Sequence, residues 1–116
     1  MSIAYTAVTI VTVLANAGVA IVDLIRAPSV LATSAAVGVS PAYIPVLGAL
    51  KAAGAAGLVV GLLGVPWIGM LAATGLVLFF IGAVVVHVRA GVFHNIAAPA
   101  SFLALAVASL IGAINH

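Results

Sequence analysis

The chain has 116 residues, of which 67% are hydrophobic and 3% charged, and its mean hydropathy is +1.54. A soluble domain usually has about a quarter of its residues charged, so this composition excludes a soluble monomer and predicts an integral membrane protein. Three Lys and Arg residues are too few for a nucleic-acid-binding surface. The absence of cysteine excludes a thiol oxidoreductase and a Cys-ligated metal.

The first apolar run covers about residues 3–25 and ends at Arg26, Ala27 and Pro28. No basic residue precedes it, so we expect a helix of the mature protein and not a cleaved signal peptide. The next segment, up to Tyr43, is too short and too polar to span a bilayer. We expect a short interfacial helix near residues 29–37 in this segment.

Three further apolar runs follow at about residues 42–65, 67–88 and 96–114. A helix of roughly 20 residues crosses about 30 Å of hydrocarbon, which matches the length of each run. A β-barrel needs alternating segments of about ten residues, and these runs are longer and do not alternate. The sequence therefore predicts an all-α integral membrane protein, a single domain over residues 1–116. Its architecture is a four-transmembrane-helix bundle with the interfacial helix between helices 1 and 2.

With four spans, both termini lie on one side of the membrane. The basic residues Arg26, Lys51 and Arg89 all fall toward the opposite side. Cytoplasmic segments carry the excess of Lys and Arg, so we expect both termini to be extracytoplasmic in a multi-pass protein of the cell membrane.

One face of the first span carries a stripe of polar side chains. Lipid offers these groups no hydrogen-bond partner, so the stripe should face the bundle interior. Two roles are open for it, hydrogen bonding between packed helices or the lining of a polar pocket or pathway. The stripe consists of Ser2, Tyr5, Thr9, Thr12, Asn16 and Asp23.

Asp23, Lys51 and Arg89 come from three different spans at the same membrane level. A buried carboxylate is tolerated mainly where cations compensate it, so we expect one ionic cluster. Arg89 shares a helix face with Gly75 and Gly82, at spacings of seven, which would let it point inward beneath a glycine groove.

Arg26 and Arg89 both have a simpler role available, reaching out to lipid phosphates, and for Arg26 this role is favoured. His87 and His94 lie near the same level as the ionic cluster, but their spacing matches no metal site, and we predict none. His116 is expected to be uninvolved.

The second span also carries a row of glycines on about the same face as Lys51, which would let another helix approach closely. Packing within one subunit explains this row, although the same feature invites a second copy, and we expect a homodimer. The row consists of Gly54, Gly57, Gly61 and Gly64.

Three segments together resemble the DoxX-like family of small bacterial four-helix membrane proteins. They are residues 48–58 (GALKAAGAAGL), 72–76 (AATGL) and 82–89 (GAVVVHVR). Pro45 and residues 37–41 (VGVSP) fit the same pattern, so the resemblance covers about residues 37–91. The resemblance implies an inner-membrane protein associated with membrane redox systems, some of which are linked to quinones.

These features favour a binding or accessory subunit for a hydrophobic ligand, a quinone or an isoprenoid lipid, linked to a membrane redox partner. The expected ligand-binding residues are Asn16, Asp23, Lys51, His87 and Arg89. A quinone is the one cofactor that the resemblance suggests.

Two other functions remain open. A membrane-embedded enzyme acting on a lipophilic substrate would use Asp23 and His87 for proton transfer, with Lys51 or Arg89 as electrophilic stabiliser. A small proton-coupled transporter would use the acid of the first span, although its cationic neighbours make it a poor proton carrier.

Overall fold

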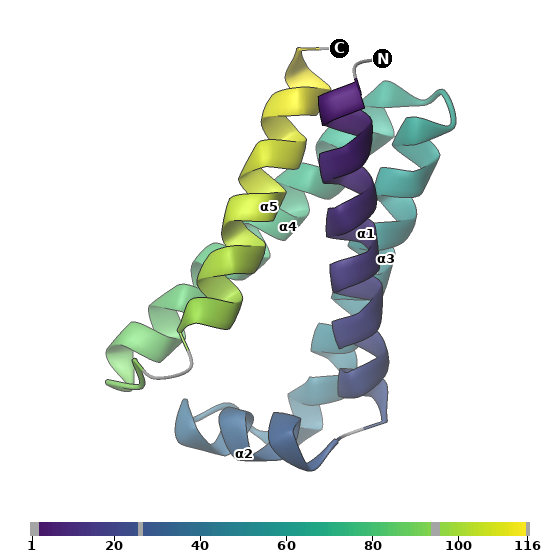
Figure 1. Ribbon diagram of the computed structural model, residues 1–116. Coiled ribbons are helices and arrows are strands. Elements are labelled where there is room, and N and C mark those ends of the chain that lie inside the picture. Colours follow the sequence, from purple (N-terminus) through teal and green to yellow (C-terminus); the bar gives the residue numbers. More distant parts are fainter. Residues whose placement is uncertain (1–2, 26, 94–95, 116) are drawn as a thin grey trace.

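The computed structural model describes residues 3–25, 27–93 and 96–115, except for the side chain of Ser29. These residues form helices and no strand (Figure 1). Four of the helices, counting η1 with α3, are long and apolar enough to cross a membrane, so the predicted fold class is confirmed. The elements are α1 (Ile3–Leu24), α2 (Pro28–Ala36), η1 (Pro41–Tyr43), α3 (Ile44–Leu62), α4 (Pro66–Arg89) and α5 (Ala97–Ile114).

Proline and glycine set several of the helix ends. Pro28, Pro41 and Pro66 each occupy the first position of a helix, where the missing N–H removes no intrahelical hydrogen bond. α3 ends at Leu62, three residues before the predicted end of the second span. The reason is Gly64, whose φ of 121° belongs to a backbone region that favours glycine.

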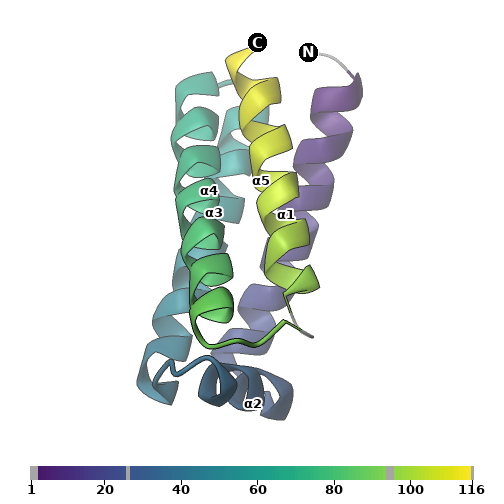
Figure 2. The same ribbon diagram turned by 90° about the vertical axis from the view of Figure 1, so that its left-hand side faces the viewer.

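The four long helices form an antiparallel bundle. Both termini lie at one end of it, and α2 lies at the other end (Figures 1 and 2). α1 packs against α3 and α5, and α4 packs against the same two helices. Toward the α2 end, α1 and α5 diverge from each other (Figure 1). The ends of the bundle therefore differ in how closely its helices approach.

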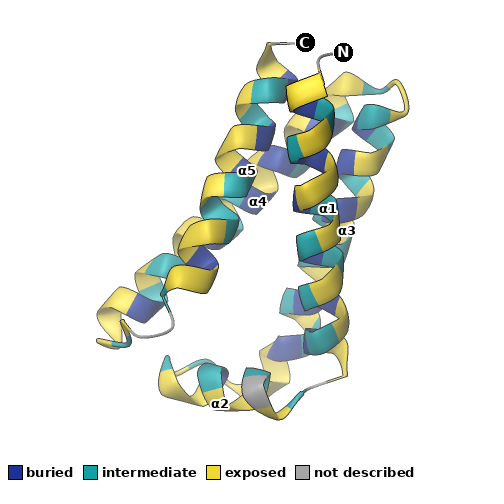
Figure 3. Ribbon diagram, in the orientation of Figure 1, coloured by how far each residue is buried: buried dark blue, intermediate teal, exposed yellow. Residues whose placement is uncertain are grey.

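Buried residues line the inward faces of the helices, and the outward faces are exposed (Figure 3). The core cluster joins α3, α4 and α5 through Leu58, Ala73, Leu76, Phe80 and Ala106. Large apolar side chains such as Leu14, Leu63 and Leu78 are exposed on the outside. An exterior of this kind suits a hydrocarbon environment, in which apolar side chains need no burial against protein.

Glycines on two faces of α3 allow it to contact α1 and α4 closely. A Cβ on Gly48 would lie 2.9 Å from the Asp23 Cβ of α1. A Cβ on Gly61 would lie 2.6 Å from the Gly69 Cα of α4. Gly54 and Gly57 also face α4. The predicted glycine row therefore packs within one chain, except for Gly64, which lies beyond the helix with open space around it.

Candidate functional site

The described part of the polar stripe on α1 is buried, from Tyr5 through Thr9, Thr12 and Asn16 to Asp23. The prediction that this stripe faces the bundle interior is therefore confirmed. Ser2, its first predicted member, lies outside the described residues.

The middle of the stripe joins α1 to α5. The hydroxyl of Thr12 lies 2.8 Å from that of Ser109 and also 2.8 Å from the Val8 carbonyl oxygen. Because the carbonyl can only accept, a Thr12 hydroxyl that donates to it must accept from Ser109. This part of the stripe has the packing role, since hydrogen bonds between hydroxyls hold membrane helices together.

Asn16 leaves a buried acceptor without a partner. Its Nδ2 donates to the Thr12 carbonyl at 2.9 Å, which fixes the orientation of the amide. Its Oδ1 accepts no hydrogen bond within the described part of the chain, and Thr9 Oγ1 has no partner there either. An unsatisfied buried polar atom costs about 1–3 kcal/mol, so these positions are expensive for packing alone.

The single acidic side chain of the protein forms a buried ion pair. Lys51 Nζ donates to Asp23 Oδ2 at 2.7 Å, and the two side chains are only 11% and 6% exposed. Gly48, one turn before Lys51, lets α3 approach the Asp23 Cβ and the Ala20 carbonyl oxygen of α1. Lys51 Nζ also lies 5.3 Å from the centre of the Phe79 ring, within reach of a cation–π interaction. The predicted pairing of Asp23 with Lys51 is present.

The prediction that Arg89 joins this cluster is wrong. Arg89 is exposed, and Lys51 is the one cation paired with Asp23 within the described residues. Gly75 and Gly82, which share its face, are also exposed, with open space where a Cβ would stand. α4 turns the face of Leu76 and Phe80 inward, because those larger side chains fill the core. The spacing of seven residues put Gly75, Gly82 and Arg89 on one face of the helix. It did not show whether that face points into the bundle or outward.

His87 is buried, and its Nδ1 donates to the Ala83 carbonyl at 2.7 Å. Its Nε2 has no partner among the described residues. The hypothetical proton-transfer pair of His87 and Asp23 is not brought into contact, since the ends of α4 and α1 that carry them lie apart (Figure 1). Arg26, His94 and His116 lie outside the described residues.

A row of aromatic rings continues inward from Lys51, and the sequence analysis did not identify it. The Phe79 and Phe80 rings meet edge to face at 5.0 Å, and the Phe80 and Phe102 rings lie 5.3 Å apart. The three rings lie on α4 and α5, and the first of them contacts Lys51 of α3. The adjacent Phe79 and Phe80 in the third predicted span were the sequence feature from which this row could have been predicted.

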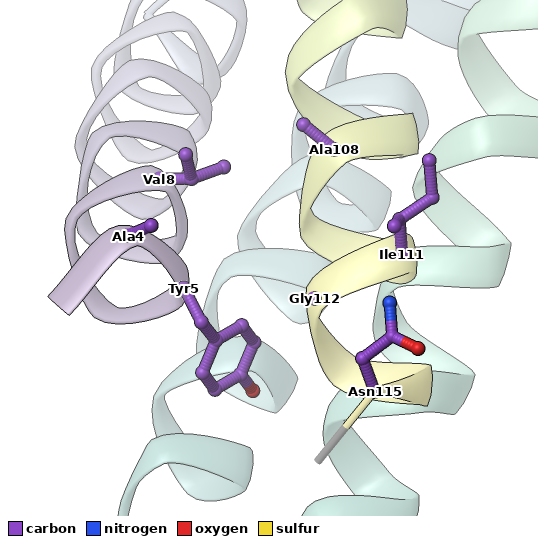
Figure 4. Close-up of a pocket in the computed structure, with 7 residues that line it drawn as sticks. All are labelled: Ala4, Tyr5, Val8, Ala108, Ile111, Gly112 and Asn115. Carbon is purple, nitrogen blue, oxygen red and sulfur yellow. The ribbon is translucent and has the colours of Figure 1, made fainter. Parts of the chain in front are cut away.

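The described residues line a pocket at each end of the bundle. One lies between α1 and α5 at the terminal end, with a volume of about 260 Å³ (Figure 4). Tyr5 and Asn115 are its polar members, and the Tyr5 ring packs where a Cβ on Gly112 would otherwise stand. The second, of about 250 Å³, is lined by Val37, Val86, Arg89 and Ala90. Within the described residues, no three His, Asp or Glu side chains gather as metal ligands.

No curated protein and no solved structure matches the chain. The model of the DoxX-like family matches residues 7–109, which extend from α1 into α5 and include the Asp23–Lys51 pair and the Thr12–Ser109 contact. Together with the four apolar spans, this match shows that the chain belongs to the DoxX-like family and is a multi-pass membrane protein.

Proposed function

We propose that this protein is a membrane-embedded binding or accessory subunit that holds a lipophilic molecule by its polar head at the Asp23–Lys51 pair. The observation that carries the proposal is the free donor capacity of Lys51. An ammonium group has three N–H donors, and one of them is used by Asp23 within the described residues. The other two suit a carbonyl or hydroxyl oxygen of a ligand head, such as that of a quinone or an isoprenoid lipid.

The surroundings of Lys51 support a ring-bearing head in particular. The Phe79 ring faces the ammonium, and Phe80 and Phe102 extend the aromatic row. Phe80 belongs to the buried core, so the half-buried Phe79 is the ring that a planar head would contact. Asn16 Oδ1, on the same buried face of α1 as Asp23, adds an acceptor in need of a donor. A quinone of a membrane redox system combines a planar ring with hydrogen-bonding oxygens.

Binding is favoured over the two alternatives by the contacts of Asp23. An enzyme using Asp23 and His87 requires the two side chains to share a substrate, and the diverging ends of α1 and α4 argue against this (Figure 1). A proton-coupled transporter requires an acid that exchanges protons readily, whereas Asp23 is held by Lys51 at 2.7 Å. The chain has no cysteine for redox chemistry of its own, so electron transfer would belong to a partner subunit.

The test is the lipid content of the purified protein. The wild type, Lys51→Met and Arg89→Met are extracted from their host membrane directly into nanodiscs, and quinones and isoprenoid lipids are quantified by mass spectrometry against bulk phospholipid. We expect enrichment in the wild type, loss in Lys51→Met, and retention in Arg89→Met. Arg89→Met is the matched control because it also removes one cation, but an exposed one.

Asp23→Asn combined with Lys51→Met covers the case in which Lys51→Met fails to fold. This double variant leaves no unpaired charge and should fold without retaining the ligand. Absence of any enriched lipophilic molecule from the wild type, or equal enrichment in the folded double variant, would overturn the proposal.

We also place the protein in a bacterial inner membrane with both termini outside. The basic residues at the α2 end support this orientation through the charge bias of cytoplasmic segments. The chain has no cysteine, so single substitutions Leu63→Cys and Ser40→Cys report on opposite ends of the bundle. An impermeant maleimide should label Leu63→Cys on intact cells and Ser40→Cys only after permeabilisation. The reverse pattern would invert the topology.

A further inference from the structure

Arg89 is a cation for which the described chain supplies no anion. The sequence contains a single acidic side chain, Asp23. Its carboxylate is occupied by Lys51, and the structure places Arg89 on the outward face of α4. The described side chains offer Arg89 no anion, so an anionic partner for its guanidinium would come from outside the chain.

The position of Arg89 in the fold indicates which kind of anion it can meet. It is the last residue of α4, at the end of the bundle where α2 lies and away from the termini (Figure 1). A transmembrane helix leaves the hydrocarbon at its end, and the guanidinium there reaches the depth of lipid phosphates.

The pocket beside Arg89 combines one charged group with apolar walls. It has a volume of about 250 Å³, and its other lining residues, Val37, Val86 and Ala90, are all apolar. Val37 follows α2, whereas the other lining residues belong to α4 and the turn after it. One charged group therefore stands beside apolar walls that two separate elements provide.

We propose that this pocket binds an anionic phospholipid, with Arg89 donating to the phosphate oxygens and the apolar walls contacting the glycerol and the first acyl carbons. A guanidinium presents two parallel N–H donors to a phosphate, which gives a directional contact. The lipid bridges α2 to the end of α4. This site is separate from the Asp23–Lys51 pair and does not depend on the ligand bound there.

A free phosphate ion would accept the same hydrogen bonds from Arg89, but it would make no favourable contact with the apolar walls of the pocket. The membrane depth of the pocket and its three apolar residues therefore favour a lipid as the source of the phosphate. Competition with inorganic phosphate distinguishes the two sources.

The experiment is native mass spectrometry of the full chain released from nanodiscs with equal amounts of phosphatidylglycerol and phosphatidylcholine. The wild type should retain one phosphatidylglycerol in preference to phosphatidylcholine. Arg89→Gln should lower that retention about fivefold, the usual effect of one basic residue at an anionic lipid surface. Arg89→Lys should recover part of it, because the charge returns without the paired donors.

A second pair of variants keeps the charge of Arg89 and tests the apolar walls of the pocket. Ala90→Leu should fill the pocket and lower retention, while Ala108→Leu, an equal change in the pocket at the terminal end, should leave it unchanged. These variants also test the proposal if Arg89→Gln does not fold. Unchanged retention in folded Arg89→Gln, equal retention of the two lipids by the wild type, or displacement of the lipid by inorganic phosphate would each overturn the proposal.

Discussion

The two ends of the bundle are built by different means. At the terminal end, small residues and neutral hydrogen bonds hold the helices together, with Gly61 against Gly69 and Thr12 bonded to Ser109. Toward the α2 end, α1 and α5 diverge (Figure 1), and a buried ion pair joins α1 to α3. Close glycine contacts occur at both ends, but at the α2 end the contact of Gly48 with α1 is combined with a buried charge pair. The stability of the terminal end therefore depends on neutral packing, and that of the α2 end depends on one charged pair.

The largest effect should follow from breaking the ion pair. Asp23→Asn leaves the Lys51 ammonium buried without a counter-charge, and the loss of one partner of a buried pair typically costs about 3–5 kcal/mol. We expect a markedly lower melting temperature in detergent, followed by circular dichroism. Adding Lys51→Met should recover part of the loss, because contacting residues are coupled. Additive effects of the two substitutions would contradict the contact.

A slightly smaller effect should come from the close contact at the terminal end. In Gly61→Ala, the new Cβ meets the Gly69 Cα at 2.6 Å, so the α3 and α4 backbones must separate. Overpacking costs about 1–3 kcal/mol, and a contact with backbone belongs at the upper limit. Thermal unfolding in detergent measures the loss. A melting temperature equal to that of the wild type would show that α3 and α4 do not approach so closely.

The hydroxyl pair between α1 and α5 should contribute less. Thr12→Val and Ser109→Ala each remove one partner of the 2.8 Å contact. Hydrogen bonds between membrane helices are worth about 0.6 kcal/mol on average and up to about 1.7 kcal/mol. We expect a coupling energy in this range from a double-mutant cycle of unfolding free energies. A coupling of zero would place the two hydroxyls out of contact.

The smallest effect on stability, and one of opposite sign, is expected from a substitution on the outward face of α4. Gly75→Ala adds a methyl group in open space, and replacing a helical glycine by alanine stabilises by about 0.5–1 kcal/mol. The melting temperature should rise slightly or stay constant. A loss comparable with that of Gly61→Ala would mean that another helix covers this face, as in the expected homodimer, and crosslinking in membranes would then identify it.

The sequence predicted the helices and two of the three members of the ionic cluster because few alternatives were available. Four apolar runs leave little choice of fold, and the polar stripe determines which face of α1 is buried. With a single carboxylate in the chain, a cation had to come from another span at the same depth, and Lys51 met that requirement.

The orientation of α4 could not be predicted in the same way. This helix is apolar on all sides, so periodicity defines which residues share a face without showing which face is inside. The sequence predicted an inward groove at Gly75 and Gly82, whereas the larger side chains of Leu76 and Phe80 fill the core. The contacts between phenylalanines of α4 and α5 also depend on how two helices cross, which no single helix encodes.

The separation of Asp23 and Lys51 along the chain has a consequence for the biogenesis of the protein. The two residues are 28 positions apart, so α1 emerges from the ribosome before α3 and its counter-charge have emerged. An isolated carboxylate at the centre of an inserting helix costs about 2.5–3.5 kcal/mol, and Asp23, one residue from the end of α1, can stay near the interface until α3 arrives. Burial of the carboxylate therefore has to wait for the insertion of α3, which carries Lys51.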